Sequence, residues 1–262
     1  MILLHDEGCD EKLNFAGKSD KGLVRRTNQD CFAVERLSDD AVFAVVCDGM
    51  GGANGGNVAS ELAVETFCEK VKGAWRSGMP QRSVYNLLKS SATAANITVF
   101  DKAKSDDALS GMGTTVVAAT VCGGMAYIIH AGDSRAYKFG KDGLVQITRD
   151  HSVVQAMEES GKLTKEAARV HPRKNVITRA LGVDENLDVE YAEVEIDEGE
   201  GLLLCSDGLT NFVSDEQIAE IIEKTPLCDC PQSFVELANK NGGGDNITAV
   251  MVLNEKGEEQ NG

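Results

Sequence analysis

Apolar residues recur along this chain with two periods, and each period predicts a different element. One set of positions falls on a single helical face, and a second set after Pro80 does the same. The two sets are Ala59, Leu62, Ala63, Phe67 and Val71, and Val84, Leu88, Ala92, Ala95 and Val99. Two long helices that pack on the core are therefore expected.

From Gly113 onward the pattern changes to short apolar runs that are separated by glycine-rich turn signals. Strands are expected at 114–121, 125–130, 134–139 and 144–148. Because each run follows the previous one after a short turn, the pattern predicts an antiparallel meander.

The second half of the chain carries shorter signals. Asp150 is the expected N-cap of a short helix that runs toward Gly161. The polar segment 152–188 lacks long periodic elements and is expected to leave the core as an excursion. Ser214 and Gln217 form a predicted capping box. The remaining expected elements are a helix at 231–239 and a strand at 247–253.

Four aspartates stand beside glycine where apolar strands begin or end. Asp48, Asp133 and Asp207 each follow an apolar run, and Asp245 lies between three glycines and the last expected strand. Carboxylates at the ends of core strands are costly to bury, and four that converge repel one another. A cluster of hard divalent cations is the simplest compensation for that charge.

Composition narrows the setting. The 262 residues, 42% of them hydrophobic, suffice for one large domain. The 42 acidic and 26 basic residues give a formal net charge of −16, which argues against nucleic acid and anionic membrane surfaces as partners. No apolar run reaches the roughly 18 residues of a membrane span, and the first residues lack a signal core. A cytoplasmic protein with reduced thiols is expected.

Six short motifs occur in order along the chain. They are SDKGLVRRTNQD at 19–30, VCDGMGG at 46–52, GMGTT at 111–115, GDSR at 132–135, CSDGL at 205–209 and GDNIT at 244–248. Together they resemble the signature of the protein phosphatase 2C family of metal-dependent Ser/Thr phosphatases. One Asp-Gly pair is chiefly a turn dipeptide, whereas six ordered motifs in compatible elements make coincidence improbable.

The resemblance implies an α+β fold, a four-layer α-β-β-α sandwich with two central antiparallel sheets and the metal site at one end. It also implies an N-terminal extension at 1–14, a catalytic domain at 15–254 and a polar tail at 255–262. Within the catalytic domain, the polar segment at about 152–188 corresponds to a flap that borders the active site.

The resemblance also implies a ligand set. Asp48 bridges two divalent ions, the backbone carbonyl of Gly49 joins one of them, and Asp207 and Asp245 complete the protein ligands. Asp133 shares a third, weaker ion with Asp207, although a plain turn aspartate on the meander stays an alternative for Asp133. All-oxygen ligation without His or Cys favours Mn²⁺ or Mg²⁺ over Zn²⁺.

Two further residues are expected to assist catalysis. The Arg25 guanidinium fits two phosphate oxygens and is expected to bind the substrate phosphate. Asp30 is expected to accept hydrogen bonds from water ligands of the metal ions. Met50 stands where animal members of the family carry a histidine proposed as general acid, and a thioether cannot donate a proton. None of the four histidines is nominated in its place.

The implied function is hydrolysis of phosphoserine and phosphothreonine in proteins, in which a metal-bridged water or hydroxide attacks phosphorus in line. The expected partners are phosphoprotein substrates and an opposing Ser/Thr protein kinase, and the chain is expected to act as a monomer. One alternative is a pseudophosphatase that binds phosphoproteins, against which the intact Asp48, Asp207 and Asp245 argue. Another is a phosphatase of the sporulation or stress-response type that acts on anti-sigma antagonists.

Overall fold

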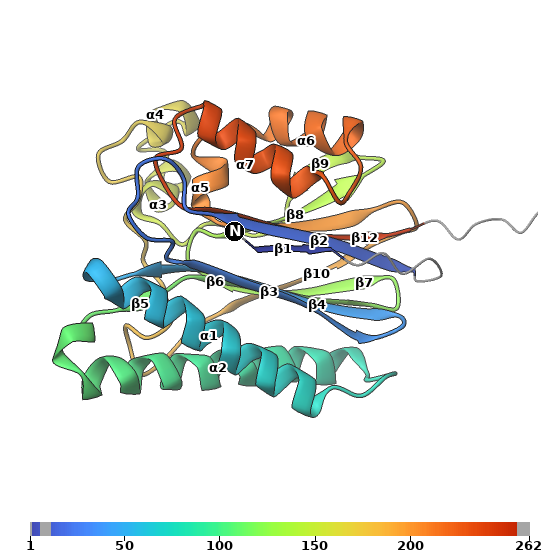
Figure 1. The fold of residues 1–262 in the computed structure, drawn as a ribbon, viewed down its shortest axis with the longest axis horizontal. Helices are drawn as coiled ribbons and strands as arrows, with labels where there is room; N and C mark the ends of the chain where they lie inside the picture. The colour runs from blue at the N-terminus through green and yellow to red at the C-terminus, as the bar shows by residue number, and fades with distance from the viewer. Residues whose placement is uncertain (1, 6–11, 256–262) are drawn as a thin grey trace, which may run out of the picture.

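The structure is a computed structural model that describes residues 2–5 and 12–255. Two antiparallel sheets lie face to face at its centre, and helices cover the outer face of each sheet (Figure 1). Stacking two sheets and covering them with helices buries the apolar faces of all four layers. The predicted α-β-β-α sandwich is confirmed.

The first sheet has six strands in the order β1-β2-β12-β11-β8-β9. The strands are β1 (Ile2–His5), β2 (Leu13–Asp20), β8 (Arg135–Gly140), β9 (Gly143–Gln146), β11 (Gly201–Cys205) and β12 (Ile247–Asn254). Helices α5 (Asp207–Thr210), α6 (Asp215–Lys224) and α7 (Cys230–Lys240) pack on its outer face. The predicted capping box of Ser214 and Gln217 starts α6.

The second sheet has the order β10-β7-β6-β4-β3, and the short β5 pairs with the end of β4. Its strands are β3 (Asp30–Ser38), β4 (Ala41–Met50), β5 (Gly113–Thr114), β6 (Val116–Cys122), β7 (Met125–Ala131) and β10 (Glu190–Glu195). The two predicted long helices, α1 (Gly52–Ala74) and α2 (Gln81–Ser105), cover its outer face, and a 3-10 turn, η1 (Asp107–Leu109), follows them.

Strand β4 shows how the layers share one core. Phe43 and Val45 are fully buried against α1 and α2, whereas Val42 and Ala44 are buried against the first sheet. Successive side chains of a strand point to opposite faces, so a strand with a core on both sides is apolar at every position. This is why the run before Asp48 is continuous rather than alternating.

The predicted meander is wrong at one connection. β6 and β7 pair in the second sheet, whereas β8 and β9 pair in the first, so the chain crosses between sheets at 132–134. Gly132 permits this crossing because its φ is +118° and because a Cβ there would lie 2.7 Å from the Cβ of Thr115. Asp133 therefore lies at the end of the sandwich between the two sheets, not on a hairpin turn.

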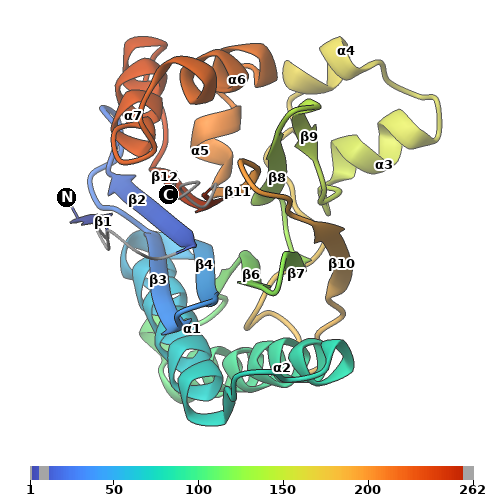
Figure 2. The same ribbon diagram turned by 90° about the vertical axis from the view of Figure 1, so that its right-hand side faces the viewer.

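The flap at 152–188 contains the short helices α3 (Val153–Glu159) and α4 (Lys165–Arg169), which stand beside β9 and outside both sheets (Figure 2). The predicted N-cap of α3 is wrong. Ser152 caps the helix, since its Oγ accepts a hydrogen bond from the Gln155 N–H. Asp150 instead forms an ion pair with Arg135.

Part of the predicted N-terminal extension belongs to the first sheet, because β1 pairs with β2 and β2 begins at Leu13. Residues 6–11 and most of the predicted tail, 256–262, lie outside the described residues. The predicted domain boundaries stay predictions. Within 2–5 and 12–255, no helix has the length and apolar character needed to cross a membrane.

Candidate active site

One cavity of about 300 Å³ gathers most of the predicted site residues. Its lining residues include Asp207, the first residue of α5, which lies at the same end of the sandwich as α3 (Figure 1). Six of the seven predicted residues line it: Arg25, Asp48, Gly49, Asp133, Asp207 and Asp245. Strand ends place these side chains together. Asp48 is near the end of β4, Asp207 begins α5 after β11, and Asp245 precedes β12.

Burial and neighbouring charge raise the pKa of three carboxylates in this cavity, those of Asp48, Asp133 and Asp207. Burial raises the pKa of Asp48 well above its ordinary value, and the charges of Asp30 and Asp207 raise it further. Burial and the Asp207 charge do the same for the pKa of Asp133, and burial and the Asp245 charge do so for the pKa of Asp207. The cluster therefore favours whatever neutralises it, either protons or bound cations.

Asp30 is the predicted site residue that does not line the cavity. It lies opposite Asp48 in the β3–β4 pairing, and its Oδ2 accepts hydrogen bonds of 2.7 Å from the Ser206 and Thr248 hydroxyl groups. Burial raises the pKa of Asp30 to about 7, although these two hydrogen bonds oppose the rise. Asp30 thus lies beside Asp48 without lining the cavity itself, and the indirect role that was expected for it stays a prediction.

The oxygen atoms that line this cavity, or lie directly behind its wall, fit hard divalent cations. Asp30 Oδ1 and Asp207 Oδ1 are buried oxygens without a hydrogen-bond partner among the described residues. A Cβ on Gly49 would lie 2.0 Å from the Gly56 carbonyl oxygen, so only glycine fits at this point of the cavity wall. Carboxylate and carbonyl oxygens are the ligands that Mn²⁺ and Mg²⁺ prefer.

Arg25 reaches the cavity from the loop between β2 and β3. Its Nη2 donates a 2.7 Å hydrogen bond to Asp245 Oδ2, within an ion pair. Asn246 braces this loop, because its side-chain oxygen accepts from the Gln29 N–H at 2.8 Å and its side-chain nitrogen donates to the Thr27 carbonyl at 3.0 Å. The backbone N–H of Asn246 also donates to Asp245 Oδ1 at 2.9 Å. Asn246 thus supports both Asp245 and the loop that holds Arg25.

Sequence reasoning missed a hydroxyl bridge between Asp48 and the crossover. The Asp48 N–H donates to Thr115 Oγ1 at 3.0 Å, and the Thr115 N–H donates to the Asp48 carbonyl at 2.8 Å. Thr115 Oγ1 also lies 2.7 Å from Ser134 Oγ, beside Asp133. Both residues belong to motifs quoted above, but no local pattern indicates contacts between hydroxyl groups so far apart in sequence.

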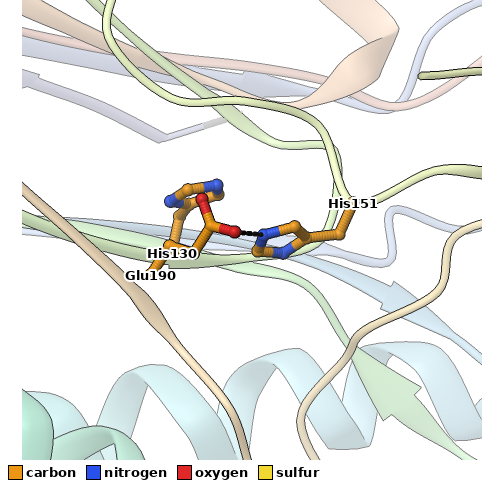
Figure 3. Close-up of side chains that lie close together, drawn as sticks. All are labelled: His130, His151 and Glu190. Atoms are coloured by element: carbon orange, nitrogen blue, oxygen red, sulfur yellow. Dashed lines mark ion pairs between the residues drawn. The ribbon is translucent and has the colours of Figure 1, made fainter. Parts of the chain in front are cut away.

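A second polar cluster lies beside the crossover and contains His130, His151 and Glu190 (Figure 3). Glu190 Oε1 lies 3.1 Å from His151 Nε2, and the two imidazole rings stack with centroids 4.6 Å apart and an angle of 11°. Stacked parallel rings do not aim their in-plane lone pairs at one ion. Arg179 Nη1 already supplies positive charge 3.2 Å from Glu190 Oε1. Among the described residues this cluster stabilises the fold beside the crossover through ion pairs and ring stacking, and its geometry does not fit a metal site.

Comparison with known proteins identifies the family. The family model described as protein phosphatase 2C matches residues 24–238. The chain belongs to the protein phosphatase 2C family. It is 37% identical over 249 residues to the serine/threonine phosphatase stp of Listeria monocytogenes, covering 92% of this chain and 97% of that protein. It is 34% identical over 248 residues to the protein phosphatase PhpP of Streptococcus pneumoniae, covering 92% and 98%.

Solved structures of the phosphatase 2C family superpose closely on this chain. Stp1 from Staphylococcus aureus has a TM-score of 0.87 at 31% identity, covering 92% of this chain and 95% of that one. The catalytic domain of the phosphatase PstP, in complex with two manganese ions, has a TM-score of 0.80 at 32% identity, covering 93% and 99%. The family and the fold expected from the sequence motifs are confirmed. The individual residue roles stay predictions.

Proposed function

We infer that the chain hydrolyses phosphoserine and phosphothreonine in proteins at a binuclear Mn²⁺ or Mg²⁺ centre. The observation that carries this conclusion is the convergence of Asp48, Asp207 and Asp245 in one cavity together with Arg25. The phosphatase 2C family membership and the two manganese ions of the related PstP domain support it.

Each residue then has a defined task. Asp48, the Gly49 carbonyl, Asp207 and Asp245 would hold the two core ions, and Asp133 with Asp207 would hold a third. When bound, the ions supply an activated water and neutralise charge on the phosphoryl oxygens. They also reverse the sign of a carboxylate cavity that would otherwise repel a phosphate dianion.

Arg25 binds the substrate phosphate in this proposal. Its guanidinium already reaches the cavity at Asp245, and once Asp245 ligates an ion the guanidinium is free to pair with phosphoryl oxygens. Asp30 keeps one carboxylate oxygen unpaired behind Asp48, and this oxygen accepts a hydrogen bond from a water at the site. In this proposal Arg25 orients the phosphate and Asp30 orients a water.

The leaving alkoxide takes its proton from water. Met50 lines the cavity but has no proton to donate, and the described lining residues include no histidine. Burial lowers the pKa of both His130 and His151, which keeps both rings neutral. The two rings stack on each other, and His151 contacts Glu190, so neither is placed to act on a substrate. Serine and threonine alkoxides are poor leaving groups, so a proton source at the site is needed.

An opposing Ser/Thr protein kinase, a cytoplasmic location and a monomeric state are further parts of this proposal. All seven described cysteines are free thiols, including the exposed Cys228, which fits a reducing compartment. Phosphoprotein substrates require a kinase that makes them. The many free acidic groups of a chain with net charge −16 favour separation of copies over association.

The test is an assay with p-nitrophenyl phosphate and a phosphothreonine peptide in Mn²⁺, in EDTA, and in EDTA followed by excess Mn²⁺. We expect EDTA to abolish turnover of both substrates and Mn²⁺ to restore it, with Asp48→Ala as the inactive control. Full activity in metal-free buffer would contradict the binuclear centre. Binding of the peptide without turnover in Mn²⁺ would instead identify a pseudophosphatase.

A further inference from the structure

A second cavity, of about 370 Å³, adjoins the candidate active site and has no task in the proposed mechanism. It lies between the flap helices α3 and α4, the start of α5 and the β8–β9 region. Asp133 and Asp207 line both cavities. The two spaces therefore meet at the end of the ligand set that would hold the third ion.

The flap segment 174–177 separates the two spaces. Lys174 lines the second cavity, whereas Asn175 and Ile177 line the candidate active site. A phosphoprotein substrate must bring peptide on both sides of its phosphorylated residue. When the phosphate lies in the active-site cavity, residues next to it in the substrate reach the second cavity across Asp133 and Asp207.

Basic side chains surround this second cavity although the chain carries a net charge of −16. They are Arg135, Arg149, Lys165 and Lys174. Arg135 is committed to Asp150, since its Nε and Nη2 donate to the two carboxylate oxygens at 2.8 and 2.7 Å. The other three stay available to a ligand to different degrees.

Lys174 is the most available of these cations. It is half-buried and forms no ion pair with another residue that the structure describes. Lys165 has only a loose ion pair of 3.7 Å with Asp215, and Arg149 pairs with Glu159 while its side chain stays 59% exposed. Exposed pairs of this kind are weak and exchange partners easily.

The acidic groups on the same lining are mostly neutralised. Asp150 pairs with Arg135, Asp133 and Asp207 would ligate cations under the proposed function, and Glu158 is the fourth acidic residue of the lining. Val154 and Ala168 are the apolar residues of the lining, and the remaining polar side chains include those of Gln146, Thr148, Gln155, Thr210 and Asn211. Apart from the two residues that would ligate cations, four basic and two acidic residues line the cavity, and this balance, together with the hydrogen-bonding groups, suits an anionic ligand better than an apolar one.

We propose that this second cavity is a peptide subsite that selects a carboxylate or a second phosphoryl group close to the phosphorylated residue of the substrate. The proposal rests on the proposed phosphatase function and adds a substrate preference to it. Lys174, Lys165 and Arg149 supply the positive charge. The net negative charge of the protein repels acidic peptides at long range, so a preference for them requires cations at the subsite itself.

The experiment compares phosphothreonine peptides of equal length in Mn²⁺ buffer. Glutamine, glutamate, lysine or phosphoserine is placed in turn at each of the three positions on either side of the phosphothreonine. We expect kcat/KM for glutamate to exceed that for glutamine about 5- to 20-fold at one or more positions, with lysine lowest. A glutamate preference that phosphoserine does not share indicates a carboxylate subsite, and a preference for phosphoserine alone indicates a phosphate subsite.

Variants of the cavity lysines test whether the second cavity causes the preference for acidic peptides. The double variant Lys165→Gln/Lys174→Gln should reduce the glutamate-to-glutamine ratio of kcat/KM to within about 2-fold, chiefly through KM. Lys102→Gln, an exposed lysine on α2 away from both cavities, is the matched control and should keep the wild-type ratio. Raising the ionic strength should weaken the preference in the wild type.

The outcomes separate the two proposals. Equal turnover of all peptides by the wild type, or a preference that survives in the double variant, overturns the subsite. Failure of every peptide and of p-nitrophenyl phosphate in Mn²⁺ overturns the phosphatase function instead.

Discussion

Asp48 and Arg25 lie in the same cavity, and the proposed mechanism gives them different parts of the reaction. Asp48 is half-buried among carboxylates that raise its pKa, whereas Arg25 is an exposed side chain held by one ion pair with Asp245. A residue that holds the catalytic ions governs the reactive water itself, and a residue that pairs with phosphate governs substrate binding.

The corresponding variants should therefore lose activity in different ways. We expect Asp48→Ala and Asp245→Ala to lower kcat by roughly 10²- to 10⁴-fold, since several kcal/mol of transition-state stabilisation depend on these ligands. Arg25→Ala should chiefly raise KM. Steady-state kinetics with p-nitrophenyl phosphate test this, with circular dichroism as the check on folding. Equal losses of kcat in all three folded variants would contradict the assigned roles.

Residue types at fixed spacing predicted which carboxylates share the cavity, but not the residues that contact them. Asp48, Asp207 and Asp245 could be predicted because each stands beside glycine next to an apolar strand. The hydroxyl of Ser206 that holds Asp30 could not, because that contact joins residues from β3 and from the β11–α5 junction. Partners of buried hydroxyl groups follow from the three-dimensional packing and not from local pattern.

At the scale of elements, helices and turns with local signals were predicted well. The capping box of α6 is a local hydrogen-bond pattern, and the apolar faces of α1 and α2 follow the helical period. The change of sheet at 132–134 was missed, because a hairpin and a crossing between stacked sheets both need only a short glycine turn. Whether β7 and β8 form a hairpin or belong to different sheets depends on the strands with which they pair, and some of those strands come later in the chain.

The bridge from β4 to this crossover provides a test at the same scale. Thr115→Val removes the acceptor for the buried Asp48 N–H and the contact with Ser134. We expect a loss of about 1–3 kcal/mol in the free energy of unfolding, together with weaker Mn²⁺ binding. Thr115→Ser keeps the hydroxyl group and should restore most of both. Urea unfolding and calorimetric Mn²⁺ titration measure the two effects. Indistinguishable Val and Ser variants would show that the hydroxyl bridge has no such role.

At the scale of the whole molecule, the carboxylate cluster links stability to pH and to metal. The Asp30 pKa rises from 3.8 to about 7 on folding, so between these values the folded state holds a proton that the unfolded state has released. Stability without metal is therefore greatest at the acidic side and falls as pH rises through this window. The raised pKa values of Asp48, Asp133 and Asp207 act in the same direction.

Carboxylates with a lowered pKa have the opposite effect on stability, but they do so in a different pH range. The Lys141 ammonium lowers the pKa of Asp197 below 3.8, so the stability from this pair is lost only as pH falls below that value.

We expect the unfolding temperature in EDTA to fall between pH 5 and pH 8. Mn²⁺ should raise it more at pH 8 than at pH 5, because ions compete with protons for the same oxygens. Thermal scans at four pH values, with EDTA or Mn²⁺, check this. A metal-free protein that becomes more stable toward pH 8 would disprove the coupling.

The position of β12 has a consequence for the synthesis of the molecule. This strand, at 247–254, lies inside the first sheet between β2, which is synthesised near the start of the chain, and β11, which is the strand directly before it in sequence. Until it emerges from the ribosome, β2 and β11 have no common neighbour, their unpaired edges are exposed, and Asp245 has not been placed. The nascent chain therefore completes its first sheet and positions Asp245 in one late step. A growing polypeptide of this kind depends on protection from aggregation until translation of the phosphatase domain is almost finished.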